Sequence, residues 1–236
     1  MEARPLTKSK RRIKHHGEVF TPDWMVQKML DIPEIDSKCK DIYATFLEPS
    51  AGDGNFLKEI LKRKLQAVIE QYHPTNWKIK SLWALSSIYG IEFLQDNLQV
   101  ARDRMFIYYL DWCKEYLHIH VSPSMDLYKA AHFIIEKNIV RGNTLTQSHP
   151  DYDSPIVFYE WKRVKNYPSK VEPTLFALGD EVGKKVNIQN RVPEGQGSLF
   201  DDLFDESPQQ ENKSIYLIKV FQIEGLKWNL ISIFLS

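Results

Sequence analysis

Two closely spaced glycines, Gly52 and Gly54, lie between an apolar run and an amphipathic run, a setting suited to ligand binding. Glycine lets the backbone approach a ligand closely, and the first turn of a following helix offers free N–H groups. Because a glycine pair alone is common, the flanking residues decide what it means. The whole segment reads Phe46-Leu47-Glu48-Pro49-Ser50-Ala51-Gly52-Asp53-Gly54-Asn55-Phe56-Leu57. We expect this segment to form the loop of a cofactor site.

A second candidate ligand residue is Glu92, which ends a short apolar run over 87–91. A carboxylate at the end of the strand beside a glycine loop can accept hydrogen bonds from both hydroxyls of a ribose. Glu92 lies well beyond the roughly 20 residues typical of a dinucleotide-binding unit. A long helix and the 73–86 connection account for the delay. The alternative is an ordinary solvated carboxylate at a strand end.

The elements that must position these residues alternate between strand and helix. Apolar residues recur at spacings of three and four within the helical runs, while the strands are short and rich in β-branched and aromatic residues. The strands are expected at 42–48, 87–92, 138–143 and 155–159, and the helices at 22–31, 55–72, 94–118 and 125–136. The first helix has Thr21 as its expected N-cap and Pro22 as its first residue. This order predicts an α/β fold with a doubly wound, mostly parallel sheet.

Composition shifts along the chain predict four regions. Residues 1–16 form a basic N-terminal arm, and 17–161 form the ligand-binding core. Residues 162–213, rich in Lys, Pro, Gly, Asn, Gln and Asp, are expected to be mostly a loop or disordered insertion. Residues 214–236 return to apolar alternation and are expected to form a β-hairpin that completes the sheet.

The overall composition excludes several classes of protein. The 236 residues carry 31 basic and 31 acidic side chains, so no global charge draws the chain to nucleic acid or to a membrane surface. No apolar run is long enough to span a membrane, and no secretory signal follows the start. The two cysteines, Cys39 and Cys113, lie far apart in no metal-ligand spacing. We therefore expect a cytoplasmic protein without a metal site.

The segment 46–57 resembles the cofactor loop of the S-adenosylmethionine-dependent adenine-N6 DNA methyltransferases, in which an acidic residue ends the first strand. Upstream, Gly17-Glu18-Val19-Phe20-Thr21-Pro22 is similar to the segment that precedes this loop in the family. Downstream, Ile139-Val140-Arg141-Gly142-Asn143-Thr144-Leu145 resembles the end of the third strand, although the family usually has Asp at the position of Asn143. The resemblance covers about 14–146 and implies a Rossmann-like methyltransferase core.

The resemblance also implies roles for individual residues. Glu48 would lie near the amino group of S-adenosylmethionine, Glu92 on its ribose, and Asn143 on its adenine. A turn-forming role is the alternative for Asn143. The backbone around Thr21 and Pro22 would hold the methionine half. The full expected cofactor site consists of Phe20, Thr21, Pro22, Glu48, Pro49, Ser50, Ala51, Gly52, Gly54, Asn55, Phe56, Glu92, Phe93, Asn143 and Leu145.

The family's catalytic motif, Asn or Asp followed by Pro, Pro and an aromatic residue, is missing after the expected fourth strand. The chain has Tyr159, Glu160 and Trp161 there. Glu160 could accept a hydrogen bond from an adenine amine, and an aromatic ring could stack on an extruded base. These three residues are the catalytic candidates. Partial versions of the motif, Ser148-His149-Pro150 and Asp153-Ser154-Pro155, precede the strand.

The expected partners follow from these motifs. DNA of a bacterial or phage restriction-modification system is the expected substrate, with RNA or protein as alternatives because many substrates share this cofactor frame. Basic residues of the arm could neutralise phosphates, namely Lys8, Lys10, Arg11, Arg12 and Lys14. Without the catalytic motif, the chain could instead be a cofactor-binding subunit that needs a partner chain. Residues Gln196-Gly197-Ser198-Leu199-Phe200 are similar to peptides that dock on the bacterial sliding clamp.

Overall fold

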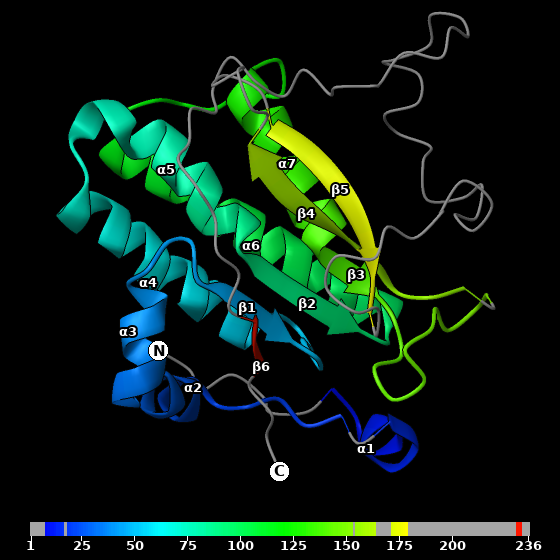
Figure 1. The fold of residues 1–236 in the computed structure, drawn as a ribbon. Coiled ribbons are helices and arrows are strands. Elements are labelled where there is room, and N and C mark those ends of the chain that lie inside the picture. Colours follow the sequence, from blue (N-terminus) through cyan, green and yellow to red (C-terminus); the bar gives the residue numbers. More distant parts are fainter. Residues whose placement is uncertain (1–7, 17, 153, 164–170, 179–229, 233–236) are drawn as a thin grey trace, which may run out of the picture.

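The computed structural model describes residues 8–16, 18–152, 154–163, 171–178 and 230–232, and shows a mixed α/β fold with a parallel sheet (Figure 1). The helices are α1 (Lys10–His16), α2 (Asp23–Leu30), α3 (Pro33–Cys39), α4 (Asn55–Gln71), α5 (Pro74–Ser86), α6 (Gln95–Tyr116) and α7 (Asp126–Asn138). The strands are β1 (Thr45–Glu48), β2 (Ile88–Glu92), β3 (Ile139–Arg141), β4 (Val157–Arg163), β5 (Val171–Ala177) and β6 (Leu230–Ser232).

The main sheet has the strand order β3-β2-β1-β6, and every neighbouring pair is parallel. Glu48 is paired with Gly90, and Glu92 with Arg141, so the carboxyl ends of the strands share one edge of the sheet. The glycine loop leaves β1 at this edge. The first three expected strands are thus confirmed as neighbours in one parallel sheet, as the βα alternation predicts.

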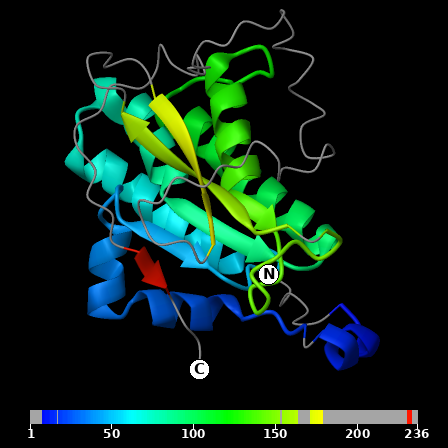
Figure 2. The same cartoon turned by 45° about the vertical axis from the view of Figure 1, so that its right-hand side comes forward.

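The two faces of the sheet are covered differently. Gly90 in β2 approaches Leu57 of α4, whereas the adjacent Tyr89 points to the other face and packs edge-on against Phe158 and Phe176. Helices α4 and α6 therefore cover one face, and the antiparallel β4–β5 hairpin packs on the other (Figures 1 and 2). Tyr89 ties the layers together, because its hydroxyl donates to the carbonyl of Tyr159 at 2.8 Å.

The expectation that the fourth strand joins the parallel sheet is wrong. The run at 155–159 does become a strand, but β4 pairs antiparallel with β5 and not with the main sheet. Part of the expected 162–213 insertion is likewise a strand, since β5 occupies 171–177. At the end of the chain, β6 is parallel to β1. The remainder of the expected C-terminal hairpin lies outside the described residues.

The helix predictions hold for α2, α4, α6 and α7 within a few residues. The expected N-cap is displaced by one position, because Pro22 itself stands at the N-cap of α2 and no side chain caps that end. Helix α5 replaces an expected irregular connection. It begins at Pro74, where the ring fixes a φ suited to the first helical turn.

One charged side chain, Lys64 of α4, is fully buried in the core. Its ammonium donates to the carbonyls of Asp41 and Ala44, both at 2.7 Å, and lies over the ring of Phe46. Burial lowers the pKa of Lys64 to about 7. This side chain therefore connects α4 to the segment that enters β1.

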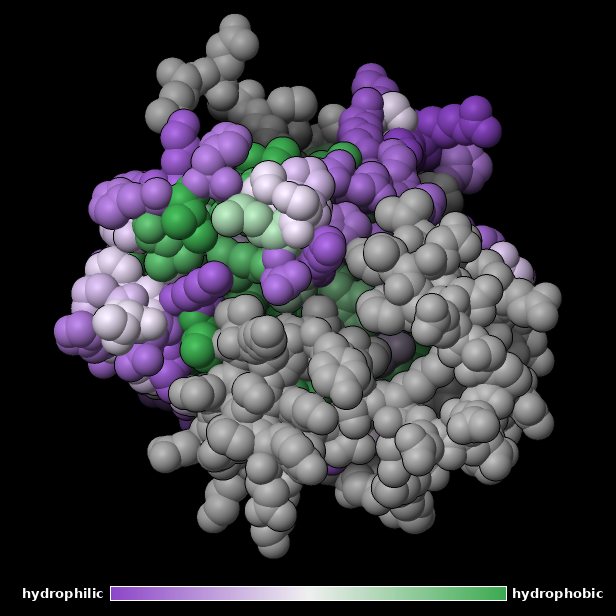
Figure 3. Space-filling model, turned by 90° about the horizontal axis from the view of Figure 1, so that it is seen from above, coloured by the Kyte–Doolittle hydropathy of each residue, from purple (hydrophilic) through white to green (hydrophobic). Residues whose placement is uncertain are grey.

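The surface seen from above alternates in polarity: hydrophobic residues, green, lie between hydrophilic residues, purple (Figure 3). Within the described ranges, no helix combines the length and apolar character needed to cross a membrane. The same ranges contain no group of three or more His, Cys, Asp or Glu side chains placed to hold a metal ion.

Candidate functional site

The glycine loop joins β1 to α4 at the carboxyl edge of the sheet. Gly52 and Gly54 both have left-handed backbone conformations, with φ of +55° and +82°. Ala51 anchors the loop to β2, because its N–H donates to the carbonyl of Ile91 at 2.8 Å. The loop then tightens through a hydrogen bond from the Gly54 N–H to the Ala51 carbonyl at 2.8 Å. Its backbone conformation favours glycine at both positions.

The two glycines meet different neighbours. A Cβ on Gly54 would lie 2.8 Å from the Cα of Ala101, so this glycine allows α6 to pack closely on the loop. A Cβ on Gly52 would lie 3.6 Å from the ring of Phe20, an ordinary contact distance. Gly54 is therefore required by helix packing. Gly52 remains the glycine that faces the upstream segment.

Glu92 lies directly beside the glycine loop. Its Oε2 accepts from the Gly52 N–H at 2.7 Å, and its Oε1 accepts from the Leu94 N–H at 2.9 Å. The residue is only 6% exposed, and burial raises the pKa of its carboxyl group. The alternative interpretation of Glu92, a solvated carboxylate at a strand end, is therefore wrong. Each carboxylate oxygen still has acceptor capacity beyond these backbone bonds.

Glu48 is the second buried carboxylate at this edge. Its Oε1 accepts from the Ser50 N–H at 3.1 Å, whereas its Oε2 is buried without a hydrogen-bond partner. The residue is 6% exposed, and burial raises the pKa of Glu48 to about 7. A buried acceptor without a partner is costly to the fold, and such groups often mark a place where a ligand supplies the missing donor.

The upstream segment closes over the start of α4. The side-chain amide of Asn55 donates to the carbonyl of Thr21 at 2.8 Å and to Asp23 Oδ1 at 2.7 Å. Together with the ring of Phe20 beside Gly52, these bonds hold the expected Phe20-Thr21-Pro22 segment against the loop. The structure thus brings the upstream motif and the glycine loop together.

Arg104 of α6 positions the loop, and no sequence pattern predicted this role. Its guanidinium donates to the carbonyl of Asp53 at 3.0 Å and to Asn55 Oδ1 at 3.1 Å. It also forms an ion pair of 3.2 Å with the carboxylate of Asp53. Arg104 therefore holds the loop from α6, 49 positions further along the chain than Asn55.

The downstream segment behaves as a turn. Asn143 Oδ1 accepts from the N–H groups of Leu145 and Thr146, at 3.0 and 3.4 Å, which favours the turn-forming role over adenine binding. Leu145 is 96% exposed. Thr144, which the motif comparison did not single out, donates its hydroxyl to the carbonyl of Pro49 and so joins this turn to the glycine loop. Phe93, the residue after Glu92, is exposed at 41%.

The catalytic candidates lie at the opposite edge of the sheet. Trp161 is buried and donates its indole N–H at 3.0 Å to Asn138, whose amide in turn donates to the carbonyls of Ser86 and Ile88 at the start of β2. The five residues of β2 separate this point from Glu92 by about 13 Å. The structure therefore does not bring the candidates to the glycine loop.

The other two candidates are engaged locally. Tyr159 accepts the Tyr89 hydroxyl with its carbonyl and stacks on Trp161, and Glu160 forms an ion pair with Lys162. The prediction for these residues is wrong for a topological reason. Strand β4 pairs with β5 and packs on one face of the parallel sheet, and it is not itself a strand of that sheet. Sequence position alone had placed these residues at the cofactor edge.

The basic arm is partly used within the fold. Residues 10–16 form α1, and Arg12 pairs with Glu18 and Asp96. Lys8 donates to Asp96 at 2.7 Å and to Asn97 at 2.6 Å. The remaining cations expected to contact DNA are exposed, namely Lys10, Arg11 and Lys14. The proposed sliding-clamp peptide at 196–200 lies outside the described residues.

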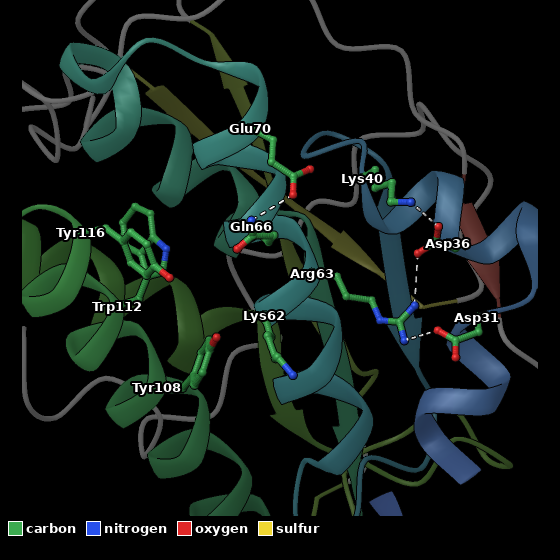
Figure 4. A pocket seen from close by; sticks show the side chains of 10 residues that line it. All are labelled: Asp31, Asp36, Lys40, Lys62, Arg63, Gln66, Glu70, Tyr108, Trp112 and Tyr116. Atoms are coloured by element: carbon green, nitrogen blue, oxygen red, sulfur yellow. Dashed lines mark hydrogen bonds and ion pairs between the residues drawn. The ribbon is translucent and has the colours of Figure 1, made fainter. Parts of the chain in front are cut away.

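A hollow of about 420 Å³ lies along α4, between α6 and the α2–α3 pair (Figure 4). None of its lining residues belongs to the expected cofactor site. Arg63, one of three cations in the lining, is paired with Asp31 and Asp36 at 2.6 and 3.2 Å. Figure 4 shows the aromatic side chains of α6 on one side and this charged cluster on the other. The lining consists of Asp31, Asp36, Lys40, Lys62, Arg63, Gln66, Glu70, Tyr108, Trp112 and Tyr116.

Comparison with known proteins gives no relative for this chain. No protein-family model matches the sequence, and no curated protein or solved structure is significantly similar to it. The site described above therefore stands on its own geometry.

Proposed function

We propose that this chain binds S-adenosylmethionine at the carboxyl edge of its parallel sheet and belongs to a system that methylates N6 of adenine in DNA. The observation that carries the proposal is the pair of buried carboxylates, Glu48 and Glu92, on either side of a loop whose backbone favours glycine. The partnerless Oε2 of Glu48 supplies the most specific part of that observation.

The chemistry of the two carboxylates suits this cofactor. S-adenosylmethionine carries a primary ammonium and two ribose hydroxyls, all of which are hydrogen-bond donors. Glu48 would accept from the ammonium, which would give its Oε2 the partner it lacks. Glu92 would accept from the ribose hydroxyls with its remaining lone pairs. When bound, the cofactor would supply an electrophilic methyl group.

The strand order also supports a ligand at this place. Strand β1 has β2 on one side and β6 on the other, so the chain connections diverge from β1. In open parallel sheets, ligands bind beyond the carboxyl ends of the strands at such a switch point. The order of the four strands is compatible with a doubly wound, Rossmann-like methyltransferase core, which we propose for this chain.

The proposal that adenine in DNA is the methyl acceptor depends on the sequence of the glycine loop and of the upstream segment, which resemble those of the DNA methyltransferases. A second candidate function is a cofactor-binding subunit that depends on a partner chain for base binding and catalysis. The observation that favours it is the position of Trp161 and its neighbours at the opposite edge of the sheet. Both candidates share the same cofactor site.

Calorimetric binding of S-adenosylmethionine to the full chain tests the shared part. We expect binding by the wild type, a loss of affinity of at least tenfold in Glu48→Gln, and no change in the exposed control Glu70→Gln. A wild type that shows no binding would refute the proposal.

Transfer of a labelled methyl group then separates the two candidates. Incorporation into adenine-containing duplex DNA, and not into RNA, supports an active DNA methyltransferase. Cofactor binding without transfer to any substrate favours the subunit function.

A further inference from the structure

The segment upstream of the loop is fixed to α6 by a compact ionic network. Arg12 donates through Nη2 to Glu18 Oε1 at 2.9 Å and through Nε to Glu18 Oε2. The same guanidinium donates to Asp96 Oδ2 and Oδ1, at 2.9 and 3.0 Å. We call these residues, with Asn97, the latch. It joins the strap, defined as residues 8–16 and 18–20, to the first turn of α6.

Asn97 lies at the centre of the latch. It is 1% exposed, and both ends of its amide are engaged: Nδ2 donates to Glu18 Oε1 at 2.7 Å, and Oδ1 accepts from Lys8 at 2.6 Å. A buried asparagine with both ends bonded holds one orientation. Asn97 lies in the first turn of α6, the helix that follows the strand ending at Glu92.

The latch also changes the electrostatic surroundings of Glu92. The N–H of Asn97 donates to the carbonyl of Leu94 at 3.1 Å, and the N–H of Leu94 donates to Glu92 Oε1 at 2.9 Å, so the latch reaches the carboxylate through one residue. Burial raises the pKa of Glu92; a hydrogen bond from Asn97 opposes that rise, and the nearby charge of Glu18 adds to it. Arg12 is the residue that neutralises Glu18, and it lowers the pKa of that carboxyl group. Removing Arg12 would therefore leave the charge of Glu18 less well neutralised beside Glu92, and a nearby like charge disfavours ionisation of Glu92.

The opposite end of the strap is fixed as well, because Phe20 lies beside Gly52. The strap thus runs from the start of α6 to the glycine loop, past the carboxylate that holds the ribose in the proposed function. We propose that Arg12, Glu18 and Asn97 are positioning residues that fix Glu92 for binding the ribose hydroxyls of the cofactor. This inference rests on the proposed function.

The experiment compares two ligands that differ only at the ribose, S-adenosylhomocysteine and its 2′-deoxy analogue, on the full chain. We expect Arg12→Gln to weaken S-adenosylhomocysteine about fivefold to tenfold and to change the affinity for the analogue less than about twofold. The control is Lys114→Gln, which removes one positive charge from an exposed position in the last turn of α6 and should change neither affinity. Asn97→Ala provides a second variant that should show the same selectivity.

Each outcome decides the inference. Selective loss for the ligand with both hydroxyls in either variant supports it, and Arg12→Lys should restore only part of the loss because lysine lacks the guanidinium fork. Equal weakening of both ligands would show a merely structural role and overturn it, as would unchanged affinity in an Arg12→Gln protein that remains folded. A wild type that binds neither ligand would instead refute the proposed cofactor site, and one that binds both equally would refute the contact of Glu92 with the ribose and with it this inference.

Discussion

The affinity of the chain for S-adenosylmethionine should rise about tenfold between pH 6 and pH 8, and Glu48 should cause most of that rise. Burial raises the pKa of Glu48 to about 7 in the ligand-free protein. An ammonium group needs the ionised carboxylate, and close approach of that cation lowers the pKa of its partner. The affinity therefore follows the ionised fraction of Glu48, which is about one tenth at pH 6 and about nine tenths at pH 8.

The perturbation is Glu48→Gln, and the assay is calorimetric titration at half-unit steps from pH 6 to pH 8. The variant should bind more weakly at pH 8 and should lose most of the pH dependence. A shallow remainder comes from Glu92, whose pKa is also raised by burial. A wild-type affinity that is flat across this range would refute the reasoning, and so would an equal slope in the variant.

The same carboxylate should affect the stability of the ligand-free protein. Its folded pKa of about 7 lies above the ordinary value of 4.5. Its stabilising contribution is therefore complete below about pH 4.5 and is lost as the pH rises to about 7. The loss is up to about 3 kcal/mol. Urea unfolding of Glu48→Gln should show this fall removed, with the variant more stable than the wild type at pH 8. A variant that is less stable than the wild type at pH 8 would contradict this account.

Three further predictions concern the frame of the site. Gly54→Ala should lower the free energy of unfolding by about 2–4 kcal/mol, because the new Cβ would lie 2.8 Å from the Cα of Ala101. Gly52→Ala should lower it by only about 1 kcal/mol. Equal losses of stability in urea unfolding would contradict the packing argument. The folded pKa of Lys64 is lowered from 10.5 to about 7, so its contribution to stability is lost as the pH falls to 7. Wild-type stability in urea unfolding should therefore rise with pH by up to about 1.4 kcal/mol per pH unit between pH 7 and 8.5. Lys64→Met should flatten this rise. Trp161→Phe should cost about 1–3 kcal/mol by leaving its hydrogen-bond partner unsatisfied, yet keep the cofactor affinity, and a selective loss of affinity would show that Trp161 does reach the site.

Local patterns in the sequence predicted the elements around the glycine loop well. The spacing of apolar residues in α4 and α6 reflects one buried face on each helix, so periodicity alone identifies them. Glu48 and Glu92 could be predicted because each is the polar residue at the end of a short apolar run. Periodicity missed α5, because Pro74 and Asn76 signal a break as readily as a helix start.

Pairing between distant strands could not be read from such patterns. The β4 run has the composition of a strand, but nothing in it specifies β5 as its neighbour. The proline at position 173 argues against a strand, yet within the described residues β5 pairs with β4 alone, and an edge strand tolerates proline. The same limit applies to Arg104 and Asn97, whose partners lie on other elements.

The pairing of β6 with β1 has a consequence for how the chain folds. Thr45 pairs with Leu230, so this contact closes a loop of about 185 residues, whereas β1, β2 and β3 lie within the first 141. Closing such a loop costs about 4–5 kcal/mol of chain entropy before the pairing gains anything. We expect β6 to join the sheet late during synthesis and to leave it early on unfolding. The loop and both carboxylates belong to the part that we expect to form first, so a cofactor site could assemble on the nascent chain before β6 emerges.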